Sequence, residues 1–449
     1  MSFHVTIRRL GHLVECMLAL SGGFRKGVPS ARNRLLFDPQ AIIRLALEIL
    51  PDICGTHGRR RGYGRHGMKL VELFCGCGGF SRGAHDAGFE VAAAYDIDEI
   101  LTSSYRRNFP ETKLFHRDVS TLTGDEILRD VGERPFGIFG GPPCQGFSDI
   151  GKRDPNDPRR GLLGHFFRVV GEVKPAFFVM ENVRGLSYKE NRPVLDQALK
   201  QVDRWYDILK PKVWDSSEFG AATKRNRIFV IGIRKGLRSA VSERDLIARK
   251  RKAATVKQAI SDLTTAREIE AVSDLPNFDR WKIVRRGAVS RYAESLMAPD
   301  KVFTGHRPTI HTRKVVERFA TVEPGKHDKV GRHPRLTWEG QCPTLRAGTG
   351  ADLGSFQSVR PIHPEEDRVI TVREAARLQG FPDSHIFHPT VWHSFRMIGN
   401  SVSPIMAEAI FATIRDRLAL KIGPNLQPEI EEAQRENSEF EEEHLEAAE

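Results

Sequence analysis

The chain has 449 residues, which is enough for two or three domains and a large hydrophobic core. Its six cysteines form neither a CxxC pair nor a disulfide framework: Cys16, Cys54, Cys75, Cys77, Cys144 and Cys342. This usage is typical of a reducing, intracellular compartment and argues against a disulfide-stabilised secreted protein. No apolar run is long enough to cross a bilayer and the N-terminal stretch is too polar for a signal peptide, so a soluble protein is expected.

The charge of the chain is unevenly distributed. Its total is +11, but residues 427–449 contain ten Glu and one Arg, a local charge of −9, which leaves +20 on the first 426 residues. A body this basic fits a polyanionic partner, although composition alone leaves an ordinary basic protein equally open. The acidic residues 423–449 are expected to form a solvated, disordered tail.

Residues 1–67 are rich in Arg and Gly and contain one candidate amphipathic helix, PQAIIRLALEIL. They end in GTHGRRRGYGRHG, whose composition is typical of a linker. We expect a poorly ordered or partly helical extension, which is either dispensable or the product of an upstream start codon, with Met68 as the true start.

From residue 68 to 235, apolar strands alternate with helical patterns, beginning with MKLVELF and ending with RIFVIGI. Regular alternation predicts an α/β fold in which helices cover both faces of a doubly wound parallel sheet. Chemically distinctive residues follow successive strands: the glycines of LFCGCGGF, Asp96, Asp118, Cys144 and Glu181. Ligands of such sheets collect at the carboxyl ends of the strands, so these residues are expected at one edge.

From residue 236 to 365 the periodicity fades and basic clusters appear, which indicates a smaller module inserted into the first domain. The helical pattern returns over 366–422. There, Thr371 and Glu374 form a predicted capping box, and Pro404 can open the last helix. An apolar stripe on that helix is expected to pack against the core, and its members are Met406, Ile410, Ile414 and Leu418.

The glycines of LFCGCGGF allow a backbone to approach a nucleotide-like ligand closely, although a plain strand-to-helix turn explains them about as well. Asp96 stands at the end of the second strand, where its carboxylate can accept hydrogen bonds from ribose hydroxyls. Asp118 can do the same for an adenine amino group after the third strand. A helix N-cap or a solvated turn is the alternative for both acids.

Cys144 lies in GGPPCQGFS directly after an apolar strand. A lone cysteine is usually core filling, but a thiolate on a rigid, accessible turn can add to an electron-poor ring carbon. Glu181, in ENVRG, follows the next strand. There a carboxyl group of raised pKa can protonate a ring nitrogen, and a buried structural Glu is the alternative.

These motifs resemble, in order, those of the cytosine-5 DNA methyltransferases: LFCGCGGF, DID, GPPCQGFS, ENVRG, TKRNRIFVIG, TVREAARLQGFP and GNSVSP. The resemblance spans about residues 68 to 420 and implies a Rossmann-like, S-adenosylmethionine-dependent methyltransferase fold with an inserted target-recognition domain. The ordered set is far more specific than any of its members. It implies transfer of a methyl group to carbon 5 of cytosine.

The resemblance also implies roles for single residues. Cys144 corresponds to the nucleophile that attacks carbon 6, Glu181 to the acid at ring nitrogen 3, and Arg225 and Arg227 to a pair of catalytic arginines, with phosphate binding or a salt bridge as the alternative. The S-adenosylmethionine contacts are implied to be Phe74, Gly76, Gly78, Gly79, Asp96, Ile97, Asp118, Val119, Pro142, Asn400 and Val402. No metal is implied.

A cytosine stacked inside a duplex is unreachable, so it must be flipped into the pocket, and the basic module of residues 236–365 is the natural clamp for the DNA. Candidate DNA contacts are Gln145, Ser148, Arg184, Thr223, Thr344, Leu345 and Arg373. A structural loop is an equal alternative for Thr344 and Leu345, and a structural role is an alternative for Arg373. Three positions depart from the family pattern: Thr223 replaces Gln, Ala222 replaces Pro, and Glu72 replaces Asp.

The leading hypothesis is a sequence-specific, prokaryotic-type DNA cytosine-5 methyltransferase that acts on duplex DNA. It is expected to be a monomer in the bacterial cytoplasm, associated with the nucleoid, with a possible cognate restriction endonuclease that acts independently. The alternatives are a tRNA cytosine-5 methyltransferase and a catalytically inactive DNA-binding protein. The sizeable basic module argues against the first, and the intact catalytic set argues against the second.

Overall fold

The computed structural model describes residues 68–143, 161–237, 241–270, 275–284, 288–347 and 360–422, with side chains up to Leu418 in the last range. All of them belong to one compact unit, His66–Glu449. Several sequence-based expectations fall outside the described residues: the extension 1–67, the tail 423–449, Cys144, Gln145 and Ser148.

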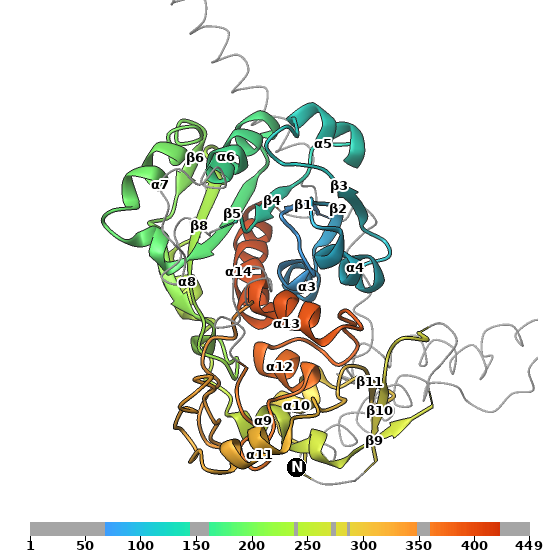
Figure 1. The fold of residues 1–449 in the computed structure, drawn as a ribbon. Coiled ribbons are helices and arrows are strands. Elements are labelled where there is room, and N and C mark those ends of the chain that lie inside the picture. Colours follow the sequence, from blue (N-terminus) through green and yellow to red (C-terminus); the bar gives the residue numbers. More distant parts are fainter. Residues whose placement is uncertain are drawn as a thin grey trace, which may run out of the picture. The chain divides into compact units, whose positions relative to one another are not determined.

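An eight-stranded sheet forms the larger part of this unit (Figure 1). Its strands run in the order β3-β2-β1-β4-β5-β8-β6, and β7 also pairs with β8. The strand bounds are β1 Lys69–Leu73, β2 Glu90–Asp96, β3 Lys113–His116, β4 Gly137–Gly140, β5 Phe177–Val183, β6 Tyr206–Ile208, β7 Lys212–Asp215 and β8 Asn226–Arg234. The chain order reverses between β1 and β4, which is the switch point where open α/β sheets bind their ligands.

The first five strands in this order are parallel, as the alternating pattern predicted, but β8 is not. β8 is antiparallel to its partners β5, β6 and β7. Its reversed direction follows from its short connection to β7, because a parallel neighbour needs a crossover of about a dozen residues or more. The predicted doubly wound architecture is confirmed, and the expectation of a wholly parallel sheet is wrong at this strand.

Alternate residues of each central strand feed two separate cores, one on either face of the sheet. One face packs Leu70 and Phe177 against helices α3 and α14, and the other packs Val71 and Phe178 against α6 and α7. Figure 1 shows α14 beside α3. The helix bounds are α3 Gly79–Asp86, α4 Glu99–Asn108, α5 Gly124–Val131, α6 Leu162–Val173, α7 Arg192–Leu199 and α14 Pro404–Ile422.

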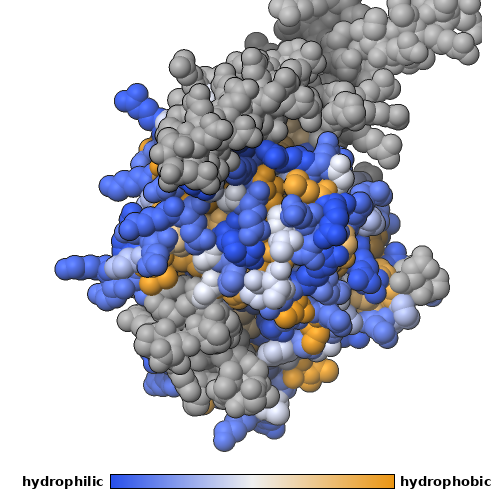
Figure 2. Space-filling view, turned by 90° about the horizontal axis from the view of Figure 1, so that it is seen from above, coloured by the Kyte–Doolittle hydropathy of each residue, from blue (hydrophilic) through white to orange (hydrophobic). Residues whose placement is uncertain are grey.

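The apolar stripe expected on α14 is confirmed, because Met406, Ile410, Ile414 and Leu418 are all fully buried. Contrary to the expectation that no apolar run could cross a bilayer, one helical stretch, Val391–Leu418, is long and apolar enough to do so by length and composition. Of its most apolar window, 78% is buried inside the protein, so packing in the core accounts for its composition. The described residues on the face shown in Figure 2 are mostly hydrophilic.

A smaller lobe is built on a three-stranded antiparallel sheet in the order β11-β10-β9. Its elements are α9 Val256–Ile260, β9 Ala266–Ile269, β10 Arg280–Ile283, α10 Arg291–Leu296, β11 Val302–Phe303 and α11 Arg313–Ala320. Helix α8 (Glu243–Ile247) precedes these elements in the chain but packs against α14, and its Leu246 belongs to the core on that face of the large sheet. Short 3-10 helices occupy Arg184–Ser187, Ser216–Glu218 and Ser261–Thr265.

Helices α12 (Val372–Gln379) and α13 (Val391–Asn400) lie between the large sheet and the smaller lobe in Figure 1. Leu378 and Phe395 from these helices share one hydrophobic cluster with Val256 and Phe303 of the smaller lobe. The predicted capping box of α12 is present, with Thr371 and Glu374 each bonding the other's backbone N–H. The segment that returns after residue 365 is therefore packed against the smaller lobe before it reaches the large sheet.

Candidate active site

The glycine-rich turn between β1 and α3 has a backbone that only small residues accommodate. Gly78 has a φ of 81°, and a Cβ there would lie 2.3 Å from the Phe109 ring. A Cβ on Gly79 would lie 1.8 Å from Ser401 Oγ. At Gly76, with a φ of 50°, a Cβ would meet no atom within 4 Å. Packing therefore dictates glycine at the second and third positions, and the first faces open space.

Asp96 holds this turn from the end of β2. Its carboxylate oxygens accept hydrogen bonds from the backbone N–H groups of Gly76 and Asp98, each at 2.9 Å. Burial raises the pKa of Asp96 above its ordinary value, although both N–H donors oppose the shift. The carboxylate is thus fixed beside the open face of the turn.

Other predicted donor-site residues surround this edge with different exposure. The Ile97 side chain is 70% exposed, which is unusual for isoleucine, and Phe74 is half-buried with a φ of 60°. Asp118 is exposed, and its carboxylate accepts the N–H of Ser120 at 2.8 Å, as in the turn considered as its alternative role. Val119 is buried in the core, so its side chain supports this loop from below.

The C-terminal segment returns to the glycine turn. Val402 is buried, and its carbonyl oxygen would lie 2.6 Å from a Cβ on Gly79, while Asn400 is exposed. The Cys77 thiol donates to the carbonyl of Met397 across 3.6 Å. Two segments more than three hundred residues apart in the chain thus meet at the turn, as expected for Asn400 and Val402.

Glu181 and Arg227 form a buried ion pair on neighbouring strands. Glu181 on β5 is opposite Phe229, and Arg227 on β8 is two positions along, opposite Val183. Arg227 Nε lies 2.7 Å from Glu181 Oε1, and the two side chains are 14% and 9% exposed. Burial raises the pKa of the Glu181 carboxyl, and the positive charges of Arg227 and Arg225 only partly oppose this shift.

The described start of the cysteine motif lies directly against this pair. A Cβ on Gly141 would be 3.0 Å from Glu181 Oε2, and the Pro142 carbonyl accepts a hydrogen bond from Asn182 Nδ2 at 3.2 Å. Gly141 and Asn182 were not among the predicted site residues. The doubled glycine of GGPPC was the available signal, because a close approach of backbone to another group favours residues without a side chain.

Arg225 differs from the catalytic contact that the sequence predicted. Its side chain is 1% exposed, and its guanidinium donates to the carbonyl of Leu345 at 3.3 Å and to that of Gly399 at 2.8 Å. It remains near enough to Glu181 to influence the pKa of that carboxyl. These two hydrogen bonds, however, go to backbone groups of other segments.

Three predicted DNA contacts are buried in the structure, which contradicts that role for their side chains. The hydroxyl of Thr223 donates to the carbonyl of Cys342 at 3.1 Å, and Leu345 is 3% exposed. Arg373 is fully buried, with its guanidinium bonded to the carbonyls of Thr304, Pro382 and His385. The structural role weighed for Arg373 fits this geometry, because a buried guanidinium must have all its donors satisfied.

Two predicted DNA contacts remain at the surface. Arg184 is exposed directly after β5, in the 3-10 helix that follows the Glu181 strand. Thr344 is exposed, and its hydroxyl donates to the carbonyl of Lys224 at 2.7 Å. Its backbone is held next to β8 while one side of the residue faces solvent.

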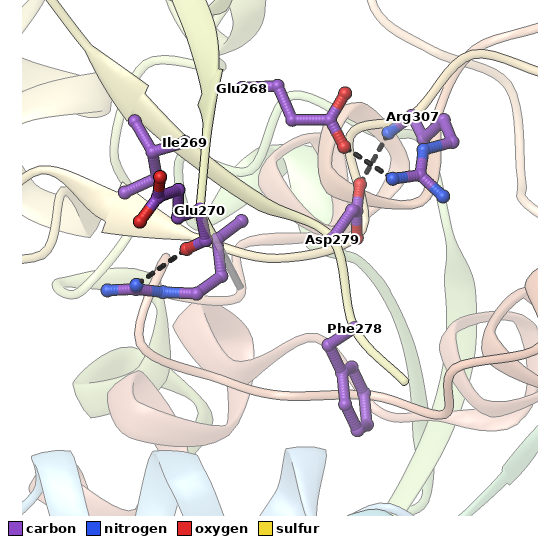
Figure 3. Close-up of a pocket in the computed structure, with 7 residues that line it drawn as sticks. Glu268, Ile269, Glu270, Phe278, Asp279 and Arg307 are labelled. Carbon is purple, nitrogen blue, oxygen red and sulfur yellow. Dashed lines mark hydrogen bonds and ion pairs between the residues drawn. The ribbon is translucent and has the colours of Figure 1, made fainter. Parts of the chain in front are cut away.

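An open hollow of about 810 Å³ lies along the sheet of the smaller lobe (Figure 3). Glu268 and Arg307 point toward one another across it and form an ion pair. Asp279 accepts the backbone N–H groups of Gly305, His306 and Arg307, which ties the loop after β11 to β10. None of these residues belongs to the predicted catalytic set.

Comparison with known proteins agrees with the geometry. A family model described as C-5 cytosine-specific DNA methylase matches residues 68–416. The Type II methyltransferase M.XorII of Xanthomonas oryzae pv. oryzae is 40% identical over 370 residues, covering 78% of this chain and 85% of the relative. The Type II methyltransferase M.DdeI of Desulfomicrobium norvegicum is 30% identical, covering 76% and 87%.

Solved structures show the same fold. A candidate DNA modification methyltransferase encoded within an E. coli prophage superposes with a TM-score of 0.67 at 37% identity, covering 78% of this chain and 99% of that one. The Dnmt2 methyltransferase of S. pombe is 17% identical with a TM-score of 0.52, and it supports the fold alone. The chain therefore belongs to the C-5 cytosine-specific DNA methylases and transfers a methyl group to carbon 5 of cytosine in DNA.

Proposed function

We propose that this enzyme methylates a flipped cytosine within a specific duplex DNA sequence, through a covalent bond to Cys144 and with S-adenosylmethionine as the methyl donor. The observation that carries this proposal is the buried Glu181–Arg227 pair, with the backbone of Gly141, three residues before Cys144, packed against its carboxylate. A nucleophile (Cys144) and an acid (Glu181) that act on the same heterocyclic ring must lie close to one another, and this contact brings their segments together.

The turn between β1 and α3 fits the adenosyl part of S-adenosylmethionine. The open space at Gly76, the exposed side chain of Ile97 and the carboxylates of Asp96 and Asp118 offer backbone, apolar and acceptor surfaces for a nucleoside. Phe74, Gly78, Gly79, Val119, Pro142, Asn400 and Val402 would support or contact it. When bound, S-adenosylmethionine supplies the electrophilic methyl group that carbon 5 takes up.

The residues of the chain prepare cytosine for that transfer. The Cys144 thiolate forms a carbon–sulfur bond at carbon 6, and Glu181 gives a proton to ring nitrogen 3 as the electron pair moves toward carbon 5. After carbon 5 is methylated, loss of its proton to a base restores the double bond, expels the thiolate and returns the nitrogen proton to Glu181.

Arg227 orients Glu181 in this scheme. A guanidinium beside a carboxyl holds it in one direction, while burial keeps its pKa above the ordinary value so that the protonated form is accessible. The environment of Glu181 therefore favours the protonated carboxyl more than water does, which suits a group that donates a proton and later recovers it.

DNA would lie between the site and the smaller lobe, with the target cytosine rotated out of the duplex. Arg184 and Thr344 are the exposed candidates for contacts to the DNA, and phosphate contacts would make its affinity fall with salt. We further propose that the enzyme acts as a monomer in the bacterial cytoplasm, at the nucleoid. Any cognate restriction endonuclease would act independently.

Transfer of labelled methyl groups from S-adenosylmethionine tests this proposal. Duplex DNA from a methylation-free host should become labelled at cytosine carbon 5, and tRNA should not. Labelling of tRNA alone would favour the tRNA-modifying alternative, and labelling of neither would favour an inactive DNA-binding protein. Sequencing of the methylated DNA by bisulfite conversion should show one recurrent sequence around the modified cytosines.

A further inference from the structure

Arg225 stands where three distant segments of the chain meet. Arg225 directly precedes β8 in the chain. Its guanidinium donates hydrogen bonds to the carbonyl of Leu345, 120 residues away, and to that of Gly399, 174 residues away. The side chain is 1% exposed. Because a guanidinium carries separate donors in a rigid plane, it can bond two carbonyls from different directions at once.

The backbone beside Arg225 is fixed to the same segment independently. Ala222 and Lys224 exchange backbone hydrogen bonds with Cys342, at 2.8 Å each, and the hydroxyl of Thr223 donates to the Cys342 carbonyl. Thr344 returns a bond to the carbonyl of Lys224. The stretch that carries the exposed Thr344, residues 342–347, is thus held along the start of β8.

Gly399 brings the third segment into direct contact with this stretch. A Cβ at Gly399 would lie 2.3 Å from the backbone N of Ala347 and 2.4 Å from the carbonyl carbon of Arg346. Real Cβ atoms do not approach backbone so closely, so glycine is required for residues 346–347 to lie against α13. Two backbones therefore touch at the place where Arg225 bonds both.

The segment from Met397 to Val402 continues from this contact to the glycine turn. The Cys77 thiol bonds the carbonyl of Met397, and Gly79 packs on Ser401 and Val402 so closely that no Cβ fits. One face of the segment thus touches the stretch 342–347, and another touches the turn assigned to the methyl donor.

We propose that Arg225 is a positioning residue that holds residues 342–347 against the 397–402 segment. It thereby fixes the DNA-binding side of the site relative to the methyl-donor side. The inference rests on the proposed function, which assigns Thr344 to the DNA side and Asn400 to the donor side. Arg225 acts through the backbone groups it bonds. Its loss should weaken the use of both substrates, whereas a residue that contacts only one substrate would affect only that one.

Steady-state kinetics of Arg225→Lys test the proposal. A lysine ammonium is a single point charge and cannot reproduce a two-carbonyl fork, so we expect the KM for S-adenosylmethionine and the KM for plasmid DNA to rise together, by about tenfold, which lies within the usual range of coupling between sites. Arg335→Lys is the matched control. Arg335 is also buried, and it bonds the carbonyls of Phe319 and His363 and the carboxylate of Asp367, none of which belongs to residues 342–347 or 397–402. Its variant should lower Tm and leave both KM values near those of wild type.

Gly399→Ala provides a second variant that opens the same junction from the other side. Both KM values should rise in it as well, and the double variant should be little worse than the poorer single one, because neighbours that act through one contact are not additive. An increase in only one KM, unchanged KM values in a folded Arg225→Lys protein, or additive effects in the double variant would overturn the inference. Methyl transfer to DNA by the wild-type enzyme is measured separately. Its absence would contradict the proposed function, whereas the variant KM values test only the role of Arg225.

Discussion

Replacing Arg227 by Met should destabilise the protein in a strongly pH-dependent way. Two unit charges 2.7 Å apart attract by about 6 kcal/mol at an effective dielectric constant near 20, before the cost of their desolvation. Removing one partner of a buried pair leaves the other uncompensated, at a cost of about 3–5 kcal/mol. Glu181 can escape that cost only by keeping a proton, since its side chain is 9% exposed.

The sign of the pH dependence follows from this escape. Burial already raises the pKa of Glu181 in the wild type, and the loss of Arg227 removes the largest opposing charge, so the pKa rises further. A folded state that holds its proton more tightly than the unfolded state is stable at low pH and loses stability as the pH rises through the folded pKa. The penalty of Arg227→Met should therefore increase with pH by up to about 1.4 kcal/mol per unit.

Urea unfolding at two pH values measures this effect. We expect the penalty of Arg227→Met to be larger near pH 8.5 than near pH 6, by up to about 1.4 kcal/mol for each unit by which the substitution raises the pKa of Glu181. In a Glu181→Gln background the titrating group is absent, so the same substitution should cost an equal amount at both pH values. If the penalty of Arg227→Met does not change with pH in the protein that retains Glu181, the reasoning is refuted.

Three further predictions concern the core, a buried ion pair and the glycine turn. Phe411→Ala should cost about 3–5 kcal/mol in urea unfolding, because the ring is fully buried with Phe139 at a centroid distance of 4.9 Å. Burial alone would raise the pKa of Glu374, but Arg368 hydrogen-bonds it and lowers the pKa to about 2. Glu374→Gln should thus destabilise most near neutral pH, and the difference from wild type should shrink as the pH falls from 4.5 toward 2. Gly78→Ala places a Cβ 2.3 Å from Phe109 at a φ of 81°, so titration calorimetry with S-adenosylhomocysteine should show at least about tenfold weaker binding. Unchanged affinity would contradict the role of the turn.

Local pattern was enough to predict the elements that form the proposed methyl-donor site. The glycines after β1 and Asp96 at the end of β2 follow from strand alternation and from turn chemistry, both of which are properties of short stretches of sequence. The capping box of α12 and the buried stripe of α14 were predicted for the same reason.

Residues whose partners are distant in sequence could not be placed in this way. The resemblance to the family implied a DNA contact for Thr223 and Arg373 and a catalytic role for Arg225. Each is instead buried, because backbone carbonyls from segments up to 174 residues away accept its hydrogen bonds. The reversed direction of β8 depends on its pairing with β7, a short strand that the alternating pattern did not reveal.

The central claim is that Cys144 bonds covalently to the target cytosine, and a trapping experiment tests it most directly. In duplex DNA with 5-fluorocytosine at the methylated position, fluorine cannot leave carbon 5 as a proton does, so the thiolate cannot be expelled. Incubation with S-adenosylmethionine should give a protein–DNA adduct that survives denaturing electrophoresis, with the DNA attached to the peptide that contains Cys144, and Cys144→Ala should give none. The absence of an adduct with the wild-type enzyme, or an equal yield from Cys144→Ala, would contradict the mechanism.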